Sequence, residues 1–216
     1  MYVYLPSCNF TRTCPEASAK IKAFMARKSD VRVAGCCRPE QKKLTAEDTV
    51  LAICQSCEAI TREVSPQAKV LSLWEYAIKD ADFPWPDFHG EEMTLQDCWR
   101  ARNNPALLDA VRTCMERMNL RTVEMAENRE HTTFDGVWLH QPVRPGNLAI
   151  APNYFGEIRE KYAQPLPEEE QQARMREWAQ QYTTERVAAY CNACLRGIRM
   201  GGARGVHLME LMTENM

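Results

Sequence analysis

Cysteines are the residues of this chain whose type and spacing could do chemistry, and there are ten of them among 216 residues. The first half contains Cys8, then the adjacent pair Cys36-Cys37, then the C-x-x-C motif of Cys54 and Cys57. Thiolates are soft ligands that select zinc, copper(I) or iron–sulfur clusters. Because a pair and a C-x-x-C can direct several thiolates to one point, this spacing predicts a metal-binding protein.

A second set of thiols repeats part of this pattern. It consists of Cys98, Cys191 and Cys194, the last two in another C-x-x-C. Cys98 lies ninety positions after Cys8, and each of the two is followed seven positions later by a proline, Pro15 or Pro105, that opens a helical pattern. We therefore infer an internal duplication.

Composition limits the class of protein. The chain is 45% hydrophobic and 26% charged with a net charge of −2, which is typical of globular proteins and gives no basic surface for nucleic acid. No apolar run approaches the ~20 residues of a membrane span, and the first residues lack the pattern of a signal peptide. Ten cysteines without an export signal indicate a reducing compartment, so we expect a cytoplasmic protein whose thiols bind metal rather than form disulfides.

Strands are expected to alternate with helices in both halves. The expected strands are residues 2–7, 31–35, 49–53 and 70–73, then 93–97, 122–125 and 186–190, with residues 206–211 echoing 70–75. Alternation of this kind predicts an α/β fold of two pseudo-symmetric Rossmann-like halves with mostly parallel sheets. Ligands of such sheets collect beyond the carboxyl ends of the strands, which is where the cysteine motifs fall. We expect domains at residues 1–80 and 91–216, joined by a linker over 79–92.

The halves differ in one long stretch. Only a short segment separates Cys37 from Cys54, whereas the corresponding part of the second half runs from about Phe134 to Cys191. It is rich in proline and contains an expected helix over residues 168–182 with an acidic first turn. This insertion is either a surface elaboration or a lid or docking surface.

The order of these motifs resembles the CCG cysteine-rich domain family, which includes the B subunit of heterodisulfide reductase. The similarity covers nearly the whole chain and rests on the five thiols of the first half and, in the second, on Asp97-Cys98, Phe134-Asp135-Gly136 and the Cys191–Cys194 motif followed by His207. In the best-understood members, one half holds a non-cubane [4Fe–4S] cluster. The resemblance implies that its ligands here are Cys8, Cys36, Cys37, Cys54 and Cys57.

Three departures from the family pattern affect this expectation. Arg38 stands where the family has a glycine after the cysteine pair, which suggests altered geometry or a positive charge beside a cluster. The first C-x-x-C also comes early, so a helix between the pair and this motif is expected to be missing. In the second half, Phe134-Asp135 replaces the pair. Its three thiols could hold a conventional cluster with a fourth ligand such as Asp135, a zinc ion, or nothing.

The resemblance favours an iron–sulfur redox protein, acting in electron transfer or as a disulfide-reductase-like subunit of an anaerobic oxidoreductase system. No dinucleotide fingerprint occurs, so a flavoprotein or ferredoxin-like redox partner is expected, and no catalytic residue is assigned. The alternative is a non-catalytic scaffold or assembly protein with a structural zinc ion or cluster. A metal-free thiol–disulfide protein acting through Cys54 and Cys57 is a third reading.

Overall fold

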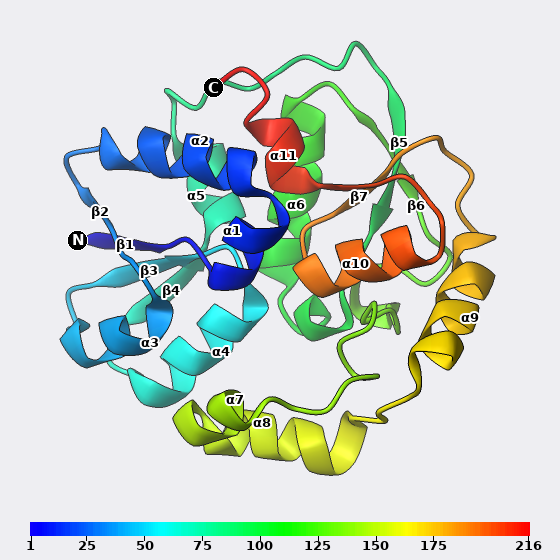
Figure 1. Ribbon diagram of the computed structural model, residues 1–216. Helices are drawn as coiled ribbons and strands as arrows, with labels where there is room; N and C mark the ends of the chain where they lie inside the picture. Colours follow the sequence, from blue (N-terminus) through cyan, green and yellow to red (C-terminus); the bar gives the residue numbers. More distant parts are fainter. The chain divides into compact units, whose positions relative to one another are not determined.

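Two four-stranded parallel sheets, each flanked by helices, form the framework of the computed structural model, which describes residues 1–216 (Figure 1). The expected α/β fold with two Rossmann-like halves is confirmed. The chain divides into two compact units, one of residues 1–80, 143–162 and 216, the other of residues 81–142 and 163–215. These units group residues that contact one another. The expected domains 1–80 and 91–216 are instead the two halves of an inferred duplication, and the division into these two domains stays a prediction.

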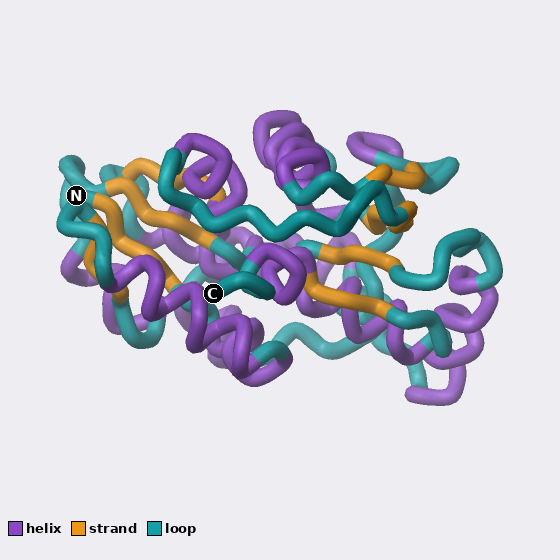
Figure 2. The backbone as a smooth tube through the Cα atoms, turned by 90° about the horizontal axis from the view of Figure 1, so that it is seen from above, coloured by secondary structure: helices purple, strands orange, loops and turns teal.

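The two sheets have the same strand order. The first contains β1 (Tyr2–Leu5), β2 (Val31–Val33), β3 (Thr49–Ala52) and β4 (Lys69–Ser72) in the order β2-β1-β3-β4. The second contains β5 (Glu92–Gln96), β6 (Arg121–Glu124), β7 (Val187–Ala189) and β8 (Gly205–His207) in the order β6-β5-β7-β8. Figure 2 shows the strands of each sheet running side by side. The shared topology is what an internal duplication predicts.

Helices connect the strands within each unit. The first unit contains α1 (Cys8–Thr13), α2 (Pro15–Ala26), α3 (Cys37–Glu40), α4 (Gln55–Val64) and α5 (Leu73–Lys79), with α7 (Pro145–Ile150), α8 (Pro152–Glu157) and a π-helical turn (Ile158–Tyr162) from the later segment. The second contains α6 (Pro105–Arg117), α9 (Glu168–Ala179), α10 (Asn192–Met200) and α11 (Leu208–Met212). Short 3₁₀ turns occur at Gln41–Lys43, Trp99–Ala101 and Arg129–His131.

Matching helix caps reinforce the correspondence between the halves. The side chains of Ser72 and Glu75 form a capping box at the start of α5, after β4. His207 and Glu210 form the same box at the start of α11, after β8. Each box satisfies backbone N–H groups that the first turn of a helix leaves unpaired. The sequence echo between residues 70–75 and 206–211 therefore reflects one strand-to-helix turn used twice.

The first strand is shorter than expected because Pro6 ends it. β1 ends at Leu5 rather than at Ser7, since proline has no N–H to continue the ladder. Ser7 then adopts a positive φ of 60°, and its side chain accepts a hydrogen bond from the Phe10 N–H, so it caps α1. Cys8 consequently lies in the first turn of a helix.

The segment between the cysteine pair and the first C-x-x-C is helical, and the expectation that a helix is missing there is wrong. Cys37 begins α3, and a 3₁₀ turn continues it to Lys43. Buried hydrogen bonds anchor the turn, because the Gln41 side chain donates to Thr61 and accepts from Ser65. The short length of the connection shortens the helix without removing it.

Part of the long insertion of the second half packs in the first unit. α8 lies against α4 (Figure 1), where the Glu63 carboxylate accepts hydrogen bonds from the backbone N–H groups of Asn153 and Tyr154 at 2.9 and 2.8 Å. Arg38 donates to the Gly146 carbonyl and to the Asn147 side chain. The position that departs from the family glycine is thus an anchor for α7.

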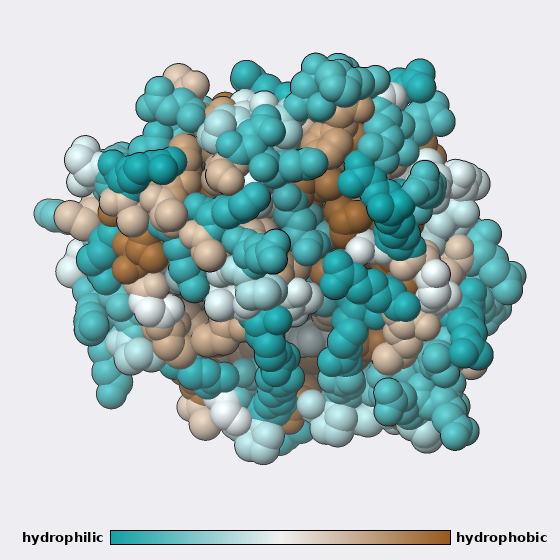
Figure 3. Space-filling view, turned by 45° about the horizontal axis from the view of Figure 1, so that its top comes forward, coloured by the Kyte–Doolittle hydropathy of each residue, from teal (hydrophilic) through white to brown (hydrophobic).

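The surface carries few large exposed apolar side chains. Met1 and Val64 are the large hydrophobic residues that are exposed, and the face in Figure 3 shows hydrophilic residues with hydrophobic ones in separate patches. None of the helices combines the length and the apolar character needed to cross a lipid bilayer.

Candidate metal centres

Three of the predicted metal ligands come together in the core of the second unit. The sulfur atoms of Cys98, Cys191 and Cys194 all lie within 4.8 Å of one another, and each residue is at most 2% exposed. Cys98 follows β5, Cys191 caps the start of α10 after β7, and Cys194 lies in the first turn of α10. We call these residues the buried triad. It could bind a metal ion, and no fourth histidine, cysteine or carboxylate joins the group.

The surroundings of the triad favour negative charge on one of its three sulfur atoms, that of Cys191. The Arg100 guanidinium donates to the Cys191 sulfur at 3.3 Å and stacks over the Trp138 ring at 4.3 Å. Hydrogen bonds from the Cys194 and Cys98 thiols, with Arg100 beside them, lower the pKa of Cys191 well below its usual range. Burial raises the pKa of Cys194. One thiolate at Cys191 is therefore stabilised by its two neighbours, and the N-terminus of α10 adds to this effect.

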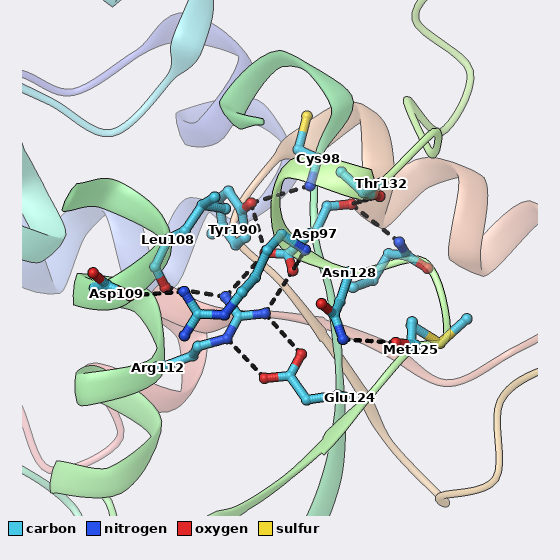
Figure 4. A network of polar contacts seen from close by, with 12 residues as sticks. Asp97, Cys98, Leu108, Asp109, Arg112, Glu124, Met125, Asn128, Thr132 and Tyr190 are labelled. Atoms are coloured by element: carbon cyan, nitrogen blue, oxygen red, sulfur yellow. Dashed lines mark hydrogen bonds and ion pairs between the residues drawn. The ribbon is translucent and has the colours of Figure 1, made fainter. Parts of the chain in front are cut away.

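A buried polar network fixes the backbone around two of these thiols (Figure 4). Tyr190 donates from its hydroxyl to the Asp97 carboxylate at 3.0 Å and accepts the Cys98 N–H at 3.0 Å. Arg112 bridges Asp97 and Glu124, at 2.7 Å from each carboxylate. Because Asp97 precedes Cys98 and Tyr190 precedes Cys191, the network places both cysteines.

Tyr190 and Arg112 were not anticipated from the sequence. The one available signal for Tyr190 was its position immediately before a C-x-x-C motif. The one signal for Arg112 was its place on the otherwise apolar stripe of α6, four positions after Leu108 and three before Met115. Its burial is understood only once Asp97 and Glu124 are placed beside it.

The loop of Phe134, Asp135 and Gly136 packs closely against the start of α10. The Phe134 carbonyl accepts the Trp99 N–H at 2.8 Å and lies 4.0 Å from the Cys194 sulfur. Gly136 has a φ of 69°, and a Cβ atom there would lie 2.1 Å from the Ala193 carbonyl oxygen. Only glycine allows this approach. The loop therefore contributes backbone, not thiolates, to the wall of the triad.

Asp135, the suggested fourth ligand, is not a member of the buried triad. Its carboxylate accepts the Leu139 N–H at 2.7 Å, and a second oxygen lies 4.0 Å from the His140 imidazole. Burial raises the pKa of Asp135. The residue instead belongs to the wall of a neighbouring pocket that includes Phe134 and His140.

Five of the six thiols of the first unit form a chain of neighbours, which we call the first set: Cys8, Cys36, Cys37, Cys54 and Cys57. The Cys8 and Cys36 sulfurs are 4.0 Å apart, and Cys57 shares thiol hydrogen bonds with Cys37 and Cys54. No three of them all lie within 4.8 Å of one another. A hydrogen bond from Cys57 lowers the pKa of Cys37, and the nearby Arg38 acts in the same direction. Their role as cluster ligands stays a prediction.

The remaining candidates have structural positions. Cys114 is fully buried in α6, and burial raises its pKa, as expected for a core thiol. Cys14 immediately precedes α2 and is also buried. The His207 Nδ1 atom accepts the Met209 N–H at 3.2 Å, and burial lowers the pKa of His207 to about 3, so the imidazole is neutral.

Comparisons of the chain with protein-family models, with curated proteins and with solved structures find no match. The resemblance to the CCG family stays a prediction.

Replacing Tyr190 by phenylalanine should weaken the metal affinity of the triad. The change leaves the buried Cys98 N–H without its acceptor, which costs about 1–3 kcal/mol of unfolding free energy. Loss of such a supporting partner typically reduces metal affinity about 10–100-fold. Cobalt(II) titration, in a background with Cys36 and Cys37 both replaced by serine, measures this affinity.

Tyr182→Phe is the matched control for Tyr190→Phe. The Tyr182 hydroxyl donates to Gln96 at 2.9 Å, so its loss also removes a hydrogen bond, but one that does not hold a cysteine. We expect its cobalt affinity to equal that of the parent. Equal affinities for all three proteins would show that Tyr190 does not position the triad.

Replacing Gly136 by alanine should destabilise the protein by about 2–5 kcal/mol, from backbone strain at positive φ and the clash with Ala193. Gly156→Ala is the control, because Gly156 lies in α8 with no atom within 4 Å of an added Cβ. Urea unfolding of the control should give the same free energy of unfolding as the parent protein. A Gly136→Ala protein as stable as the parent would contradict the close approach of this loop to α10.

The neutral, buried His207 predicts a pH-dependent stability. Its pKa is about 3 in the folded chain against an ordinary value of 6.5, so between these values mainly the unfolded chain takes up a proton. The unfolding free energy therefore falls as the pH drops below 6.5, by about 2 kcal/mol at pH 5 from this residue. His207→Asn keeps an acceptor for Met209 and should lose less stability between pH 8 and pH 5 in urea unfolding. Identical losses would refute the assignment.

Proposed function

We propose that this chain is an iron–sulfur redox protein whose [4Fe–4S] cluster is held by the first set, Cys8, Cys36, Cys37, Cys54 and Cys57. The observation that carries the proposal is the convergence of these thiols at the carboxyl ends of β1, β2 and β3. Neighbouring strands of a parallel sheet end at one edge, so three separate motifs reach one place. The N-terminus of α4 and the Arg38 guanidinium both favour an anionic group there.

The spread of the first set suits a cluster better than a single ion. Four sulfurs around one zinc ion lie about 3.8 Å apart, given a Zn–S distance of about 2.3 Å. In a cluster the thiolates bind different iron atoms, so they stand farther apart. Cys8 and Cys36 contact each other, as do Cys37 and Cys57, but no three members are mutually close.

Access to the first set fits electron exchange with a partner. Cys8 is exposed and Cys36 is half-buried, whereas Cys37, Cys54 and Cys57 are buried. A cluster held here would have one edge near the surface and the other in the core. The partner is proposed to be a flavoprotein or a ferredoxin-like subunit, and the system a cytoplasmic, anaerobic oxidoreductase of the heterodisulfide reductase kind.

The buried triad favours a second candidate, a scaffold or assembly protein in which metal has a structural role. Its three thiols are closed off from solvent, and Arg100 partly offsets their charge. Metal held there would join β5 to α10 without exchanging ligands, as structural sites do. The two candidates differ in whether the first set carries iron.

Metal analysis of anaerobically purified protein distinguishes them. We expect about four iron and four acid-labile sulfide per chain, with a redox-active EPR signal, held by the first set. Replacing Cys36 and Cys37 together by serine should remove this iron, because two of the five ligands are lost. Cys114→Ser is the control, since Cys114 is buried in α6 and belongs to neither set.

Other results would change the proposal in defined ways. About eight irons per chain would mean that the triad holds a cluster too. Zinc without iron, or iron that survives loss of both Cys36 and Cys37, would reject the first set as a cluster site and leave the scaffold candidate.

A further inference from the structure

A pocket in the second unit adjoins the loop that replaced the cysteine pair. It has a volume of about 690 Å³ and lies between the loop of Phe134, Asp135 and Gly136 and helix α9. Volumes of this order accommodate small organic ligands. Phe134 and Asp135, which stand in the second half where the first half has its cysteine pair, therefore form part of the wall of a cavity.

The apolar part of the pocket is aromatic. Trp178 of α9 stacks on Phe134 with ring centroids 5.0 Å apart, and both rings line the cavity together with Met175. The Trp178 Nε1–H donates to Gln96 at 2.8 Å, which holds the indole in place. Such a surface can accept a flat ring or the face-on approach of a cation.

The buried polar groups of the pocket are acceptors. The His140 imidazole lies beside Asp135, with 4.0 Å between its Nε2 atom and the carboxylate, and the two side chains are 13% and 8% exposed. With the imidazole proton on the nitrogen that faces the carboxylate, Nδ1 is left as an acceptor, and this buried atom has no hydrogen-bond partner in the chain. Buried oxygen and nitrogen acceptors of this kind favour a ligand that carries hydrogen-bond donors.

We propose that this pocket binds a small organic ammonium ion whose apolar or aromatic part rests on Phe134 and Trp178. An ammonium group has three N–H donors and a positive charge, which match the Asp135 carboxylate. Arg174 and Glu177 stand exposed at the rim, where solvent screens their charges, so the buried acceptors decide the class of ligand. The proposal does not depend on metal in either set.

Benzylammonium is a suitable probe because it joins an aromatic ring to an ammonium group. Isothermal titration calorimetry of the full chain should show its binding, with benzyl alcohol at least about tenfold weaker, since the neutral analogue lacks the charge-assisted bonds. Asp135→Asn should weaken benzylammonium by about tenfold or more while keeping an acceptor for the Leu139 N–H. Glu169→Gln, an exposed acid of α9 outside this pocket, should change nothing.

A rim variant keeps the test decisive if Asp135→Asn does not fold. Arg174→Glu changes an exposed residue and should tighten benzylammonium a few-fold at low salt, because it removes a like charge from the entrance. The proposal is overturned by equal binding of benzyl alcohol, by stronger binding of benzoate, by no binding at about 10 mM probe, or by no effect of either charge variant. Iron content should be the same in all these variants, so a negative result here is separate from failure of the cluster proposal.

Discussion

Asp97 is the constraint on which the second half of the chain depends. Its carboxylate is 1% exposed, and an unpaired charge in such a place is strongly unfavourable. Arg112 from α6, the Tyr190 hydroxyl after β7 and the Arg129 N–H together satisfy it. Removing one partner of a buried pair typically costs about 3–5 kcal/mol, so these segments are held to one arrangement. Because Cys98 follows Asp97 and Cys191 follows Tyr190, this arrangement also fixes the backbone of both cysteines. The close packing of the triad is the result.

The first half has no charged residue at the two positions that match Asp97 and Tyr190. Ser7 stands at the position of Asp97 and Ile53 at that of Tyr190, so a helix cap and an apolar contact replace the ionic network. Its thiols are correspondingly less confined, with Cys8 exposed. The shared strand order shows one framework, while these substitutions give one half an open row of thiols and the other a closed group.

Repetition along the chain made much of this predictable. The spacing from Cys8 to Cys98, together with the two C-x-x-C motifs, was sufficient to place the three triad cysteines at strand ends. What the pattern could not supply were contacts between distant residues. The sequence suggests either altered geometry or a positive charge beside a cluster at Arg38. The residue does lie near Cys37, but its hydrogen bonds hold a segment over one hundred positions later. The sequence does not predict α3, because this four-residue helix begins within the cysteine motif and is too short to show a helical period.

The difference in burial separates the roles that the two thiol sets can have. Electron exchange requires a partner to come close, and the first set reaches the surface through Cys8. The triad is enclosed by the Asp97 network, the Phe134 loop and Arg100, so ligands there cannot exchange without opening the core. If all three thiols lost their protons on binding a metal, the three thiolates would need positive charge, of which Arg100 provides one unit. A metal ion or cluster would provide the rest and would stabilise the fold. The nearby loop of Phe134 and Asp135 also forms the aromatic and carboxylate wall of a pocket.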